Sequence, residues 1–229
     1  MYYVVEDAEA VARRAAGWIA DAIRKSVDER NRCALALVGG NSPRGCYERL
    51  PAQPRVPWDR VEIYFGDERA VPPDSSDSNY HMAWELFLRH VPITAAQVHR
   101  MEVERGDLAS VAREYEAILP ESLDVLMLGI GVDGHTASLF PHAPSLSERE
   151  RRVMPVAGGD PFVQRLTITP PVIRSAHRIL VIATGAEKAQ VVARALEGMD
   201  DVAGVPAQLA RQGTWILDRA AAGGLTRQS

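Results

Sequence analysis

The 229-residue sequence has little of what marks several large classes of protein. Its two cysteines, Cys33 and Cys46, are too few for a disulfide framework and lack the CxxC spacing of a zinc site. Basic residues are not in excess, because 26 Lys and Arg stand against 30 Asp and Glu, for a net charge of −4. We therefore expect no nucleic-acid partner, since domains that bind polyanions usually carry a basic surface. A small anionic ligand stays compatible with this charge.

Long apolar segments are also missing. No stretch approaches the ~18 apolar residues that a membrane helix needs, and the N-terminus lacks the basic and apolar regions of a signal peptide. We therefore expect a cytoplasmic protein with no membrane partner. With 46% hydrophobic residues, the chain can build a single α/β domain over residues 1–222, followed by a flexible tail at 223–229.

Short apolar runs alternate with helical patterns along the chain. Most runs are continuous, as in strands covered on both faces, and they lie at 34–38, 61–65, 124–130, 178–184 and 214–217. Helical spacing predicts helices at 8–27, 43–50, 78–90, 108–119 and 186–196. This order predicts an α/β fold with a mainly parallel sheet flanked by helices, whose ligands bind beyond the carboxyl ends of the strands.

Two local features refine this prediction. The run at 164–169 alternates more than the others and is followed by two prolines, so we expect an edge or irregular strand there. Ser42 and Thr184 are candidate N-caps, and Glu187 would complete a capping box with Thr184.

The loop after the apolar run at 34–38 has the sequence GGNSPRG. Gly39 and Gly40 let the backbone approach a ligand, the N–H groups of the following helix can bind an anion, and Asn41 and Ser42 add polar side chains. The loop lacks the Gly-Lys-Ser/Thr of a P-loop and the second glycine of a nucleophile elbow. A phosphate site and a plain capped turn both fit this pattern.

Charged residues in other loops are further candidates. Arg69 can clamp an anion with its planar guanidinium, and Asp67 or Glu68 can bind hydroxyls or move protons. Lys188 lies in the first turn of a predicted helix, where the helix dipole disfavours a cation unless it faces an anionic ligand. Arg165 is a similar candidate. The alternatives are a solvated turn with a local ion pair and ordinary exposed cations.

The loop at 129–141 reads GIGVDGHTASLFP. Its literal GxGxxG does not indicate a dinucleotide site, because Pro141 and Pro144 leave little support for a long helix after it. A histidine can act as a general base at neutral pH, and a carboxylate two residues away can orient it. His135 and Asp133 are therefore the candidate catalytic pair, with an ordinary turn histidine as the alternative. The other histidines have no metal-binding spacing, so we expect neither a metal nor a cofactor.

These motifs together resemble the 6-phosphogluconolactonase family. GGNSP at 39–43, GDER at 66–69 and above all the long motif at 129–141 occur in the family's order. The resemblance implies the fold shared with glucosamine-6-phosphate deaminase and ribose-5-phosphate isomerase. It also implies hydrolysis of 6-phospho-D-glucono-1,5-lactone to 6-phosphogluconate in the pentose phosphate pathway, with no metal. His135 would be the general base and Asp133 its partner. The residues that would hold phosphate or sugar are Gly39, Gly40, Asn41, Ser42, Asp67, Arg69, Arg165 and Lys188.

The deaminases are the main alternative within this resemblance, because they share the glycine loop and the Asp-Gly-His. Their motif continues to Asn-Glu-Pro, and its glutamate takes part in ring opening. Here the corresponding residues are Leu-Phe-Pro, and Phe140 cannot transfer a proton. The chain also departs from the lactonase pattern, with Asn41 and Ser42 for the usual Ser-Thr pair and His142 where glycine is common.

An alternative of another class is a non-catalytic sensor of sugar phosphates. Such a protein would usually carry a DNA-binding or partner domain, for which we expect no room in 229 residues. Asp133 and His135 favour catalysis over sensing. The sequence leaves a monomer and a homodimer equally open.

Overall fold

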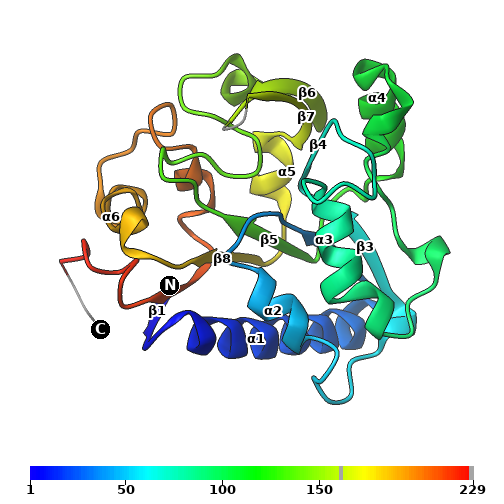
Figure 1. Cartoon of the computed structure of the whole chain (residues 1–229), viewed down its shortest axis with the longest axis horizontal. Coiled ribbons are helices and arrows are strands. Elements are labelled where there is room, and N and C mark those ends of the chain that lie inside the picture. The colour runs from blue at the N-terminus through cyan, green and yellow to red at the C-terminus, as the bar shows by residue number, and fades with distance from the viewer. Residues whose placement is uncertain (160–161, 227–229) are drawn as a thin grey trace.

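A six-stranded sheet forms the centre of the computed structural model, which describes residues 1–159 and 162–226 (Figure 1). All neighbouring strands in it are parallel. In spatial order they are β1 (Tyr2–Val5), β9 (Thr214–Asp218), β8 (Ile179–Ala183), β5 (Val125–Gly129), β2 (Cys33–Leu37) and β3 (Val61–Phe65). The α/β class with a mainly parallel sheet is therefore confirmed, with β1 as an edge strand that the sequence did not reveal.

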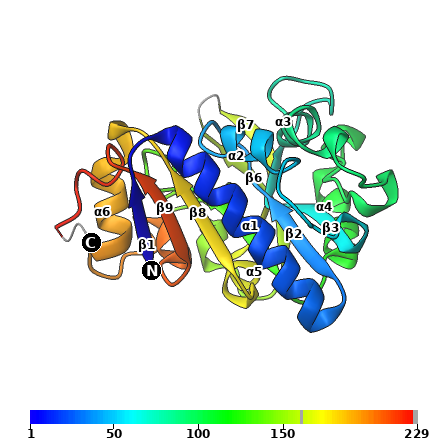
Figure 2. The same ribbon diagram turned by 90° about the horizontal axis from the view of Figure 1, so that it is seen from below.

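Helices cover both faces of this sheet (Figures 1 and 2). One face packs against α1 (Ala8–Arg30), α2 (Arg44–Arg49) and α3 (Asn79–Leu86). The other packs against α4 (Leu108–Ile118), α5 (Pro170–Ser175), α6 (Ala189–Glu197) and a smaller sheet. Short 3-10 helices lie at Trp58–Arg60, Leu88–His90, Ala95–Gln97, Val103–Arg105, Pro144–Ser147, Ala186–Lys188 and Pro206–Ala210. Within the described part of the chain, none of the helices has the length and apolar character needed to cross a membrane.

The two-sided cover explains the continuous apolar runs. In β2, Leu35 and Leu37 pack toward α1, whereas Ala34 and Ala36 pack toward the opposite core. All five residues of β2 are buried. A strand in this position needs apolar side chains on both faces, so its sequence shows no alternation.

The smaller sheet consists of three antiparallel strands in the order β4 (Asp67–Arg69), β7 (Val163–Ile168) and β6 (Val153–Gly158). The expectation of an edge or irregular strand at 164–169 is therefore wrong, because β7 lies in the middle. Its two neighbours are hard to recognise in the sequence. β4 has only three residues, all charged, and β6 contains Pro155, which an edge strand tolerates.

Gly66 joins the two sheets. Its N–H donates to the Leu37 carbonyl of β2 at 2.9 Å, and its carbonyl accepts from the Ile168 N–H of β7 at 2.8 Å. The chain therefore passes from β3 into β4 through a single residue that is hydrogen-bonded to both sheets. This fixes the side chains of β4 beside the carboxyl ends of the parallel strands.

Some helix ends differ from the predicted ends. α1 runs three residues further than expected, to Arg30, and is followed by the C-cap Asn31, whose φ of 59° is left-handed. The predicted helix at 78–90 ends at Leu86 and is followed by a 3-10 turn. The predicted helix at 186–196 divides into a 3-10 turn and α6.

The predicted C-terminal tail lies partly outside the described residues, since 227–229 are not among them. Of the rest, Leu225 is buried in the core cluster that contains α6. The N–H and hydroxyl of Thr226 both donate to the Glu197 carboxylate, at 3.0 and 2.9 Å. Side-chain packing therefore extends beyond residue 222.

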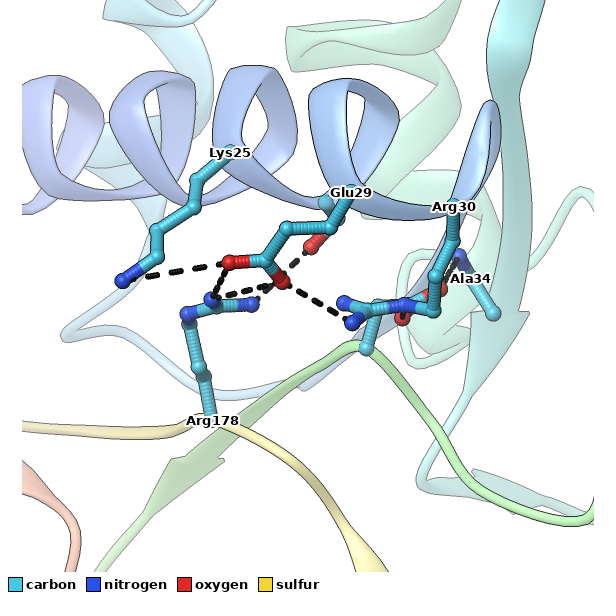
Figure 3. A network of polar contacts seen from close by, with 7 residues as sticks. Lys25, Glu29, Arg30, Ala34 and Arg178 are labelled. Atoms are coloured by element: carbon cyan, nitrogen blue, oxygen red, sulfur yellow. Dashed lines mark hydrogen bonds and ion pairs between the residues drawn. The ribbon is translucent and has the colours of Figure 1, made fainter.

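A polar network fastens α1 to the amino ends of the central strands (Figure 3). Glu29 accepts from Arg30 at 2.9 Å and from Arg178, which immediately precedes β8, at 3.3 Å. Arg30 also donates to the buried Asp124 carboxylate at 2.6 Å, and Asp124 accepts from the Ala34 N–H of β2 at 2.7 Å. The network lies at the amino ends of β5 and β8, so the opposite edge of the sheet is left for a ligand.

Two buried tyrosines hold the carboxyl ends of β2 and β3. The Tyr47 hydroxyl donates to the Val38 carbonyl at 2.7 Å and accepts from the Val38 N–H at 2.9 Å. Tyr115 does the same with Phe65, at 3.1 and 2.8 Å. Burial raises the pKa of both hydroxyls far above the usual range of tyrosine, so both stay protonated. Each tyrosine satisfies a backbone group at the point where its strand turns into a loop.

Removing either hydroxyl should destabilise the protein. In Tyr47→Phe and Tyr115→Phe, a buried N–H and a buried carbonyl lose their partner, which costs about 1–3 kcal/mol in the free energy of unfolding. Tyr3→Phe is the control, because its ring packs against the core and under Arg14, while its hydroxyl has no hydrogen-bond partner among the described residues. Urea unfolding monitored by circular dichroism measures all three. Equal midpoints for the control and the two buried variants would contradict the role assigned to the hydroxyls.

Candidate active site

A cavity of about 430 Å³ lies at the carboxyl ends of the parallel strands. Its volume falls in the range of small-molecule sites. All the sequence-predicted site residues line it except Asp133 and the alternative candidate Glu68. The lining consists of Val38, Gly39, Gly40, Asn41, Ser42, Pro43, Asp67, Arg69, Asn79, Gly129, Ile130, Gly131, Val132, His135, Ala137, Arg165 and Lys188. The tertiary structure therefore brings together residues that are up to about 150 positions apart in the sequence.

Asp133 lies behind His135 and holds its ring. The Asp133 Oδ1 atom is 2.6 Å from His135 Nδ1 and also accepts from the His135 N–H at 3.1 Å. Partial burial would raise the pKa of the Asp133 carboxyl, but the hydrogen bonds and charge of His135 lower it below its usual value. An ionised carboxylate can only accept, so Nδ1 carries the proton and Nε2 is the ring nitrogen left to accept one.

The loop that carries this pair is tightly folded and depends on two glycines. The Gly131 N–H donates to the His135 carbonyl at 2.9 Å, and the Gly134 N–H donates to the Gly131 carbonyl at 3.0 Å. Gly134 has a φ of 96°, which glycine adopts without strain. A Cβ on Gly131 would lie 2.2 Å from the His135 ring and 2.7 Å from Asp133 Oδ1. The His–Asp pair therefore occupies the space that this glycine leaves.

Two arginines face the cavity from the smaller sheet. Arg69 of β4 and Arg165 of β7 are paired in the antiparallel register. Arg165 is buried, its Nε donates to the Gly158 carbonyl at 3.0 Å, and its guanidinium lies 5.7 Å from the Phe140 ring. Burial lowers the pKa of Arg165, partly offset by the negative charge of Asp67. This is a desolvated cation at a cavity wall, a placement that suits an anionic ligand.

The adjacent carboxylates of β4 have different surroundings. Glu68 accepts from the N–H groups of Arg69, Asn79 and Tyr80 and from the Ser78 hydroxyl, at 2.8–2.9 Å. It is buried at the start of α3 and does not line the cavity. Burial raises its pKa, although these four hydrogen bonds act in the opposite direction. Glu68 therefore anchors α3.

Asp67 points to the other side of β4 and lines the cavity. Its carboxylate accepts from the Ser138 hydroxyl at 2.6 Å and from the Asn79 amide at 3.1 Å. Of the two carboxylates that the sequence left open, the structure thus places only Asp67 where it can meet a ligand.

Ser42 connects the glycine loop to Lys188 and does not cap α2. Its hydroxyl lies 3.0 Å from Thr184 Oγ1 and accepts from Lys188 Nζ at 3.1 Å. The N-cap position of α2 belongs to Pro43, without a side-chain hydrogen bond, so the prediction of Ser42 as N-cap is wrong. The long-range contact with Lys188 and Thr184 occupies the hydroxyl instead.

The predicted capping box between Thr184 and Glu187 is also wrong. Gly185, with a φ of 100°, takes the N-cap position of the 3-10 turn, and no side chain caps it. The Gly185 N–H donates to the Asp218 carboxylate of β9 at 3.1 Å. Burial lowers the pKa of Lys188, while the charges of Glu187 and Asp218 partly restore it. Lys188 is therefore a half-buried cation that faces the cavity with its charge incompletely balanced.

A family model described as glucosamine-6-phosphate isomerases/6-phosphogluconolactonase matches residues 6–217. The chain belongs to this family. The resemblance inferred from the motifs is thereby confirmed over most of the sequence.

Curated relatives and solved structures agree with this membership. The chain is 34% identical over 231 residues to a 6-phosphogluconolactonase from Nostoc sp., with 95% of each chain covered. It is 37% identical over 236 residues to a human 6-phosphogluconolactonase, covering 96% of this chain and 88% of the other. The structure of a 6-phosphogluconolactonase from Trypanosoma brucei matches with a TM-score of 0.87, 29% identity and coverage of 99% and 98%. A monomeric glucosamine-6-phosphate deaminase, at 23% identity and a TM-score of 0.86, shares the fold.

Phe140, on the same loop as His135, packs against the candidate base. Its ring centroid lies 5.1 Å from that of His135, and Arg165 lies beyond it. A Cβ on Gly158 would come within 2.7 Å of the Phe140 ring, so the smaller sheet packs closely around it. An apolar ring thus packs beside the candidate base.

Two polar residues of the site were missed by sequence reasoning. Asn79 lines the cavity and Ser138 donates to Asp67. Asn79 follows the N-cap Ser78 and reads as an ordinary first helical residue, and Ser138 lies within a motif whose chemistry was assigned to its histidine. No local signal distinguishes them, because their partners are on β4.

Potential metal ligands are not clustered in the described part of the chain. Within residues 1–159 and 162–226, no group of three or more His, Cys, Asp or Glu side chains could hold an ion. Cys33 and Cys46 are both buried and free, and burial raises the pKa of both thiols, to about 12 for Cys33.

Gly131→Ala should separate His135 from Asp133, because the new Cβ takes the space of the histidine ring. The pKa of the Asp133 carboxyl should then rise toward its usual value, since His135 is what lowers it. Carbon-13 NMR titration of the Asp133 carboxyl in the unliganded protein measures this change. Gly129→Ala is the matched control, as its Cβ would meet no atom within 4 Å. If the titration of Asp133 is unchanged in Gly131→Ala, its contact with His135 is not what lowers the pKa of this carboxyl.

Proposed function

We propose that the chain hydrolyses 6-phospho-D-glucono-1,5-lactone to 6-phospho-D-gluconate, with His135 as general base. The observation that carries the proposal is the His135–Asp133 pair, at 2.6 Å, whose histidine faces the same cavity as three cationic side chains. The relatives named 6-phosphogluconolactonase support the choice of substrate. The three cations, Arg69, Arg165 and Lys188, suit the phosphate that such a substrate carries.

The first step is the attack of water on the lactone carbonyl. His135 Nε2 accepts a proton from water as the water oxygen forms a bond to C1. The C1–O double bond opens and leaves an oxyanion on the former carbonyl oxygen. Asp133 stabilises the positive charge that develops on the ring. General base catalysis of this kind contributes roughly 10²–10⁴-fold to a rate.

The second step is the collapse of the tetrahedral intermediate. The carbonyl re-forms, the bond between C1 and the ring oxygen breaks, and the ring oxygen takes the proton from His135 Nε2. The product is the open-chain acid, which ionises, and His135 is returned to its neutral form. No covalent enzyme intermediate is needed, because a lactone is already a reactive ester.

The cations and the glycine loop position the substrate. Arg69, Arg165 and Lys188, together with the 39–42 loop, hold the phosphate and the sugar ring. Phosphate binding orients C1 toward His135 and lowers the entropic cost of the reaction. A cation or N–H group close to C1 stabilises the oxyanion, an effect often worth several kcal/mol.

The deaminase and sensor alternatives are less well supported. Deaminase chemistry needs a second proton-transfer group, and the apolar Phe140 lies at the position where the deaminase motif has its glutamate. A sensor needs no oriented base, whereas Asp133 fixes the tautomer of His135. We propose a single domain over residues 1–222 as the catalytic unit.

His135→Ala should lose most of the lactonase activity while the fold is retained, because the variant lacks the Nε2 atom that takes the proton from water. A coupled dehydrogenase assay measures hydrolysis above the spontaneous rate, and a parallel assay for ammonia from glucosamine 6-phosphate tests the deaminase alternative. His177→Ala, at the amino end of β8, is the control. A wild-type rate for His135→Ala would show that His135 is not the base.

Product affinity should fall at alkaline pH because of Lys188. Only the protonated amine attracts phosphate, and burial lowers the pKa of Lys188 from 10.5, so the loss begins at lower pH than for an exposed lysine. Titration calorimetry with 6-phosphogluconate from about pH 8 to about pH 10 measures this loss. Lys188→Arg keeps its charge over this range and should show a weaker dependence. The same pH dependence in both proteins would rule out Lys188 as its source.

A further inference from the structure

Asn79 lies where β4, α3 and the glycine loop meet. It is 3% exposed, and its side-chain amide faces both functional residues of β4. The amide oxygen accepts from Arg69 Nη1 at 2.7 Å. The amide nitrogen donates to the backbone carbonyl of Asp67 at 2.8 Å and to its carboxylate at 3.1 Å. One side chain thus holds a guanidinium and a carboxylate at the same cavity wall.

This amide has little freedom to move. The Asn79 N–H donates to the buried Glu68 carboxylate at 2.8 Å, so its backbone is anchored. On the other side, a Cβ on Gly39 would lie 1.9 Å from the Asn79 amide oxygen. The glycine loop therefore packs directly on the amide, and this close approach requires the absence of a side chain at position 39.

The contacts of Arg69 leave one edge of its guanidinium available. Both hydrogens of Nη1 are used, one by the Asn79 amide oxygen and one by the Asp77 carbonyl. Among the described residues, Nε and Nη2 have no hydrogen-bond partner. These two groups lie on the same edge of the planar guanidinium, and such an edge binds two oxygens of one phosphate.

We propose that Asn79 is a positioning residue for substrate binding. By occupying Nη1 of Arg69, it directs the Nε–Nη2 edge into the cavity, where that edge binds the phosphate. The identity of the ligand rests on the proposed function, whereas the orientation of Arg69 rests on the contacts above. A residue that acts in this way affects the bound ground state and the transition state alike, so it changes KM and leaves kcat nearly unaltered.

A double-mutant cycle between Asn79 and Arg69 tests the proposal. Asn79→Ala should raise KM by about tenfold, the lower end expected for loss of a hydrogen bond to a charged group, with kcat nearly unchanged. Arg69→Ala should raise KM at least as much. The double variant should raise KM by much less than the product of the two single effects, because Asn79 acts mainly through that guanidinium.

Two further variants separate this role from general stability. Gly39→Ala displaces the Asn79 amide without altering it, so its effect on KM should also be much smaller in an Arg69→Ala background. Ser138→Ala removes the other partner of the Asp67 carboxylate and does not touch Arg69, so its effect should persist in that background. If Asn79→Ala fails to fold, the Gly39→Ala cycle still decides the question.

Additive effects of Asn79→Ala and Arg69→Ala, or a fall in kcat at constant KM, would overturn the proposal. If the wild-type chain does not hydrolyse the lactone, the proposed function fails, and the cycle is measured instead by calorimetric binding of inorganic phosphate. Coupling between the two substitutions in phosphate affinity would still support the positioning role. Independent effects on phosphate affinity would exclude it.

Discussion

The cavity depends on Gly66, whose N–H is hydrogen-bonded to the central sheet and whose carbonyl is hydrogen-bonded to the smaller sheet. Because β3 continues into β4 through this single residue, Arg69 is held a few residues from the end of a buried parallel strand. The antiparallel register with β7 then sets Arg165 beside it. The cavity lies between the carboxyl edge of one sheet and a strand of the other. Strands of the smaller sheet form one wall, and short loops that directly follow parallel strands form much of the other. Groups held on or next to rigid elements are placed accurately.

The number of hydrogen-bond donors around a carboxylate distinguishes those carboxylates that maintain the fold from those that remain available to a ligand. Glu68 has four donors and Asp124 holds a backbone N–H of β2 together with Arg30. Asp67 has two side-chain donors and lines the cavity. The hydrogen bonds of Asp133 orient His135. A buried carboxylate with a full set of donors stabilises an element, whereas one with unused lone pairs beside a cavity can still respond to a ligand.

The cavity is lined by cationic side chains although the chain as a whole has a net charge of −4. The chain carries more acidic than basic residues, but the cavity collects two arginines and one lysine that are partly or fully removed from water. Burial lowers the pKa of Arg165 and Lys188, which means that their charges are poorly solvated in the unliganded protein. A bound phosphate would stabilise these two positive charges in place of the water that burial excludes. The site therefore suits one small anion.

Local sequence determined the α/β class, the central strands except β1, and the loops that carry the candidate site, because periodicity and glycine placement act over a few residues. It also singled out the Asp133–His135 pair, whose members are two residues apart. Only the tertiary structure decided that β7 is central, that Ser42 meets Lys188 rather than capping α2, that Asp67 and not Glu68 faces the cavity, and that Asn79 belongs to the site. Each of these depends on a partner from a distant segment. The residues next to a position in the sequence do not determine which distant group will satisfy its hydrogen bonds.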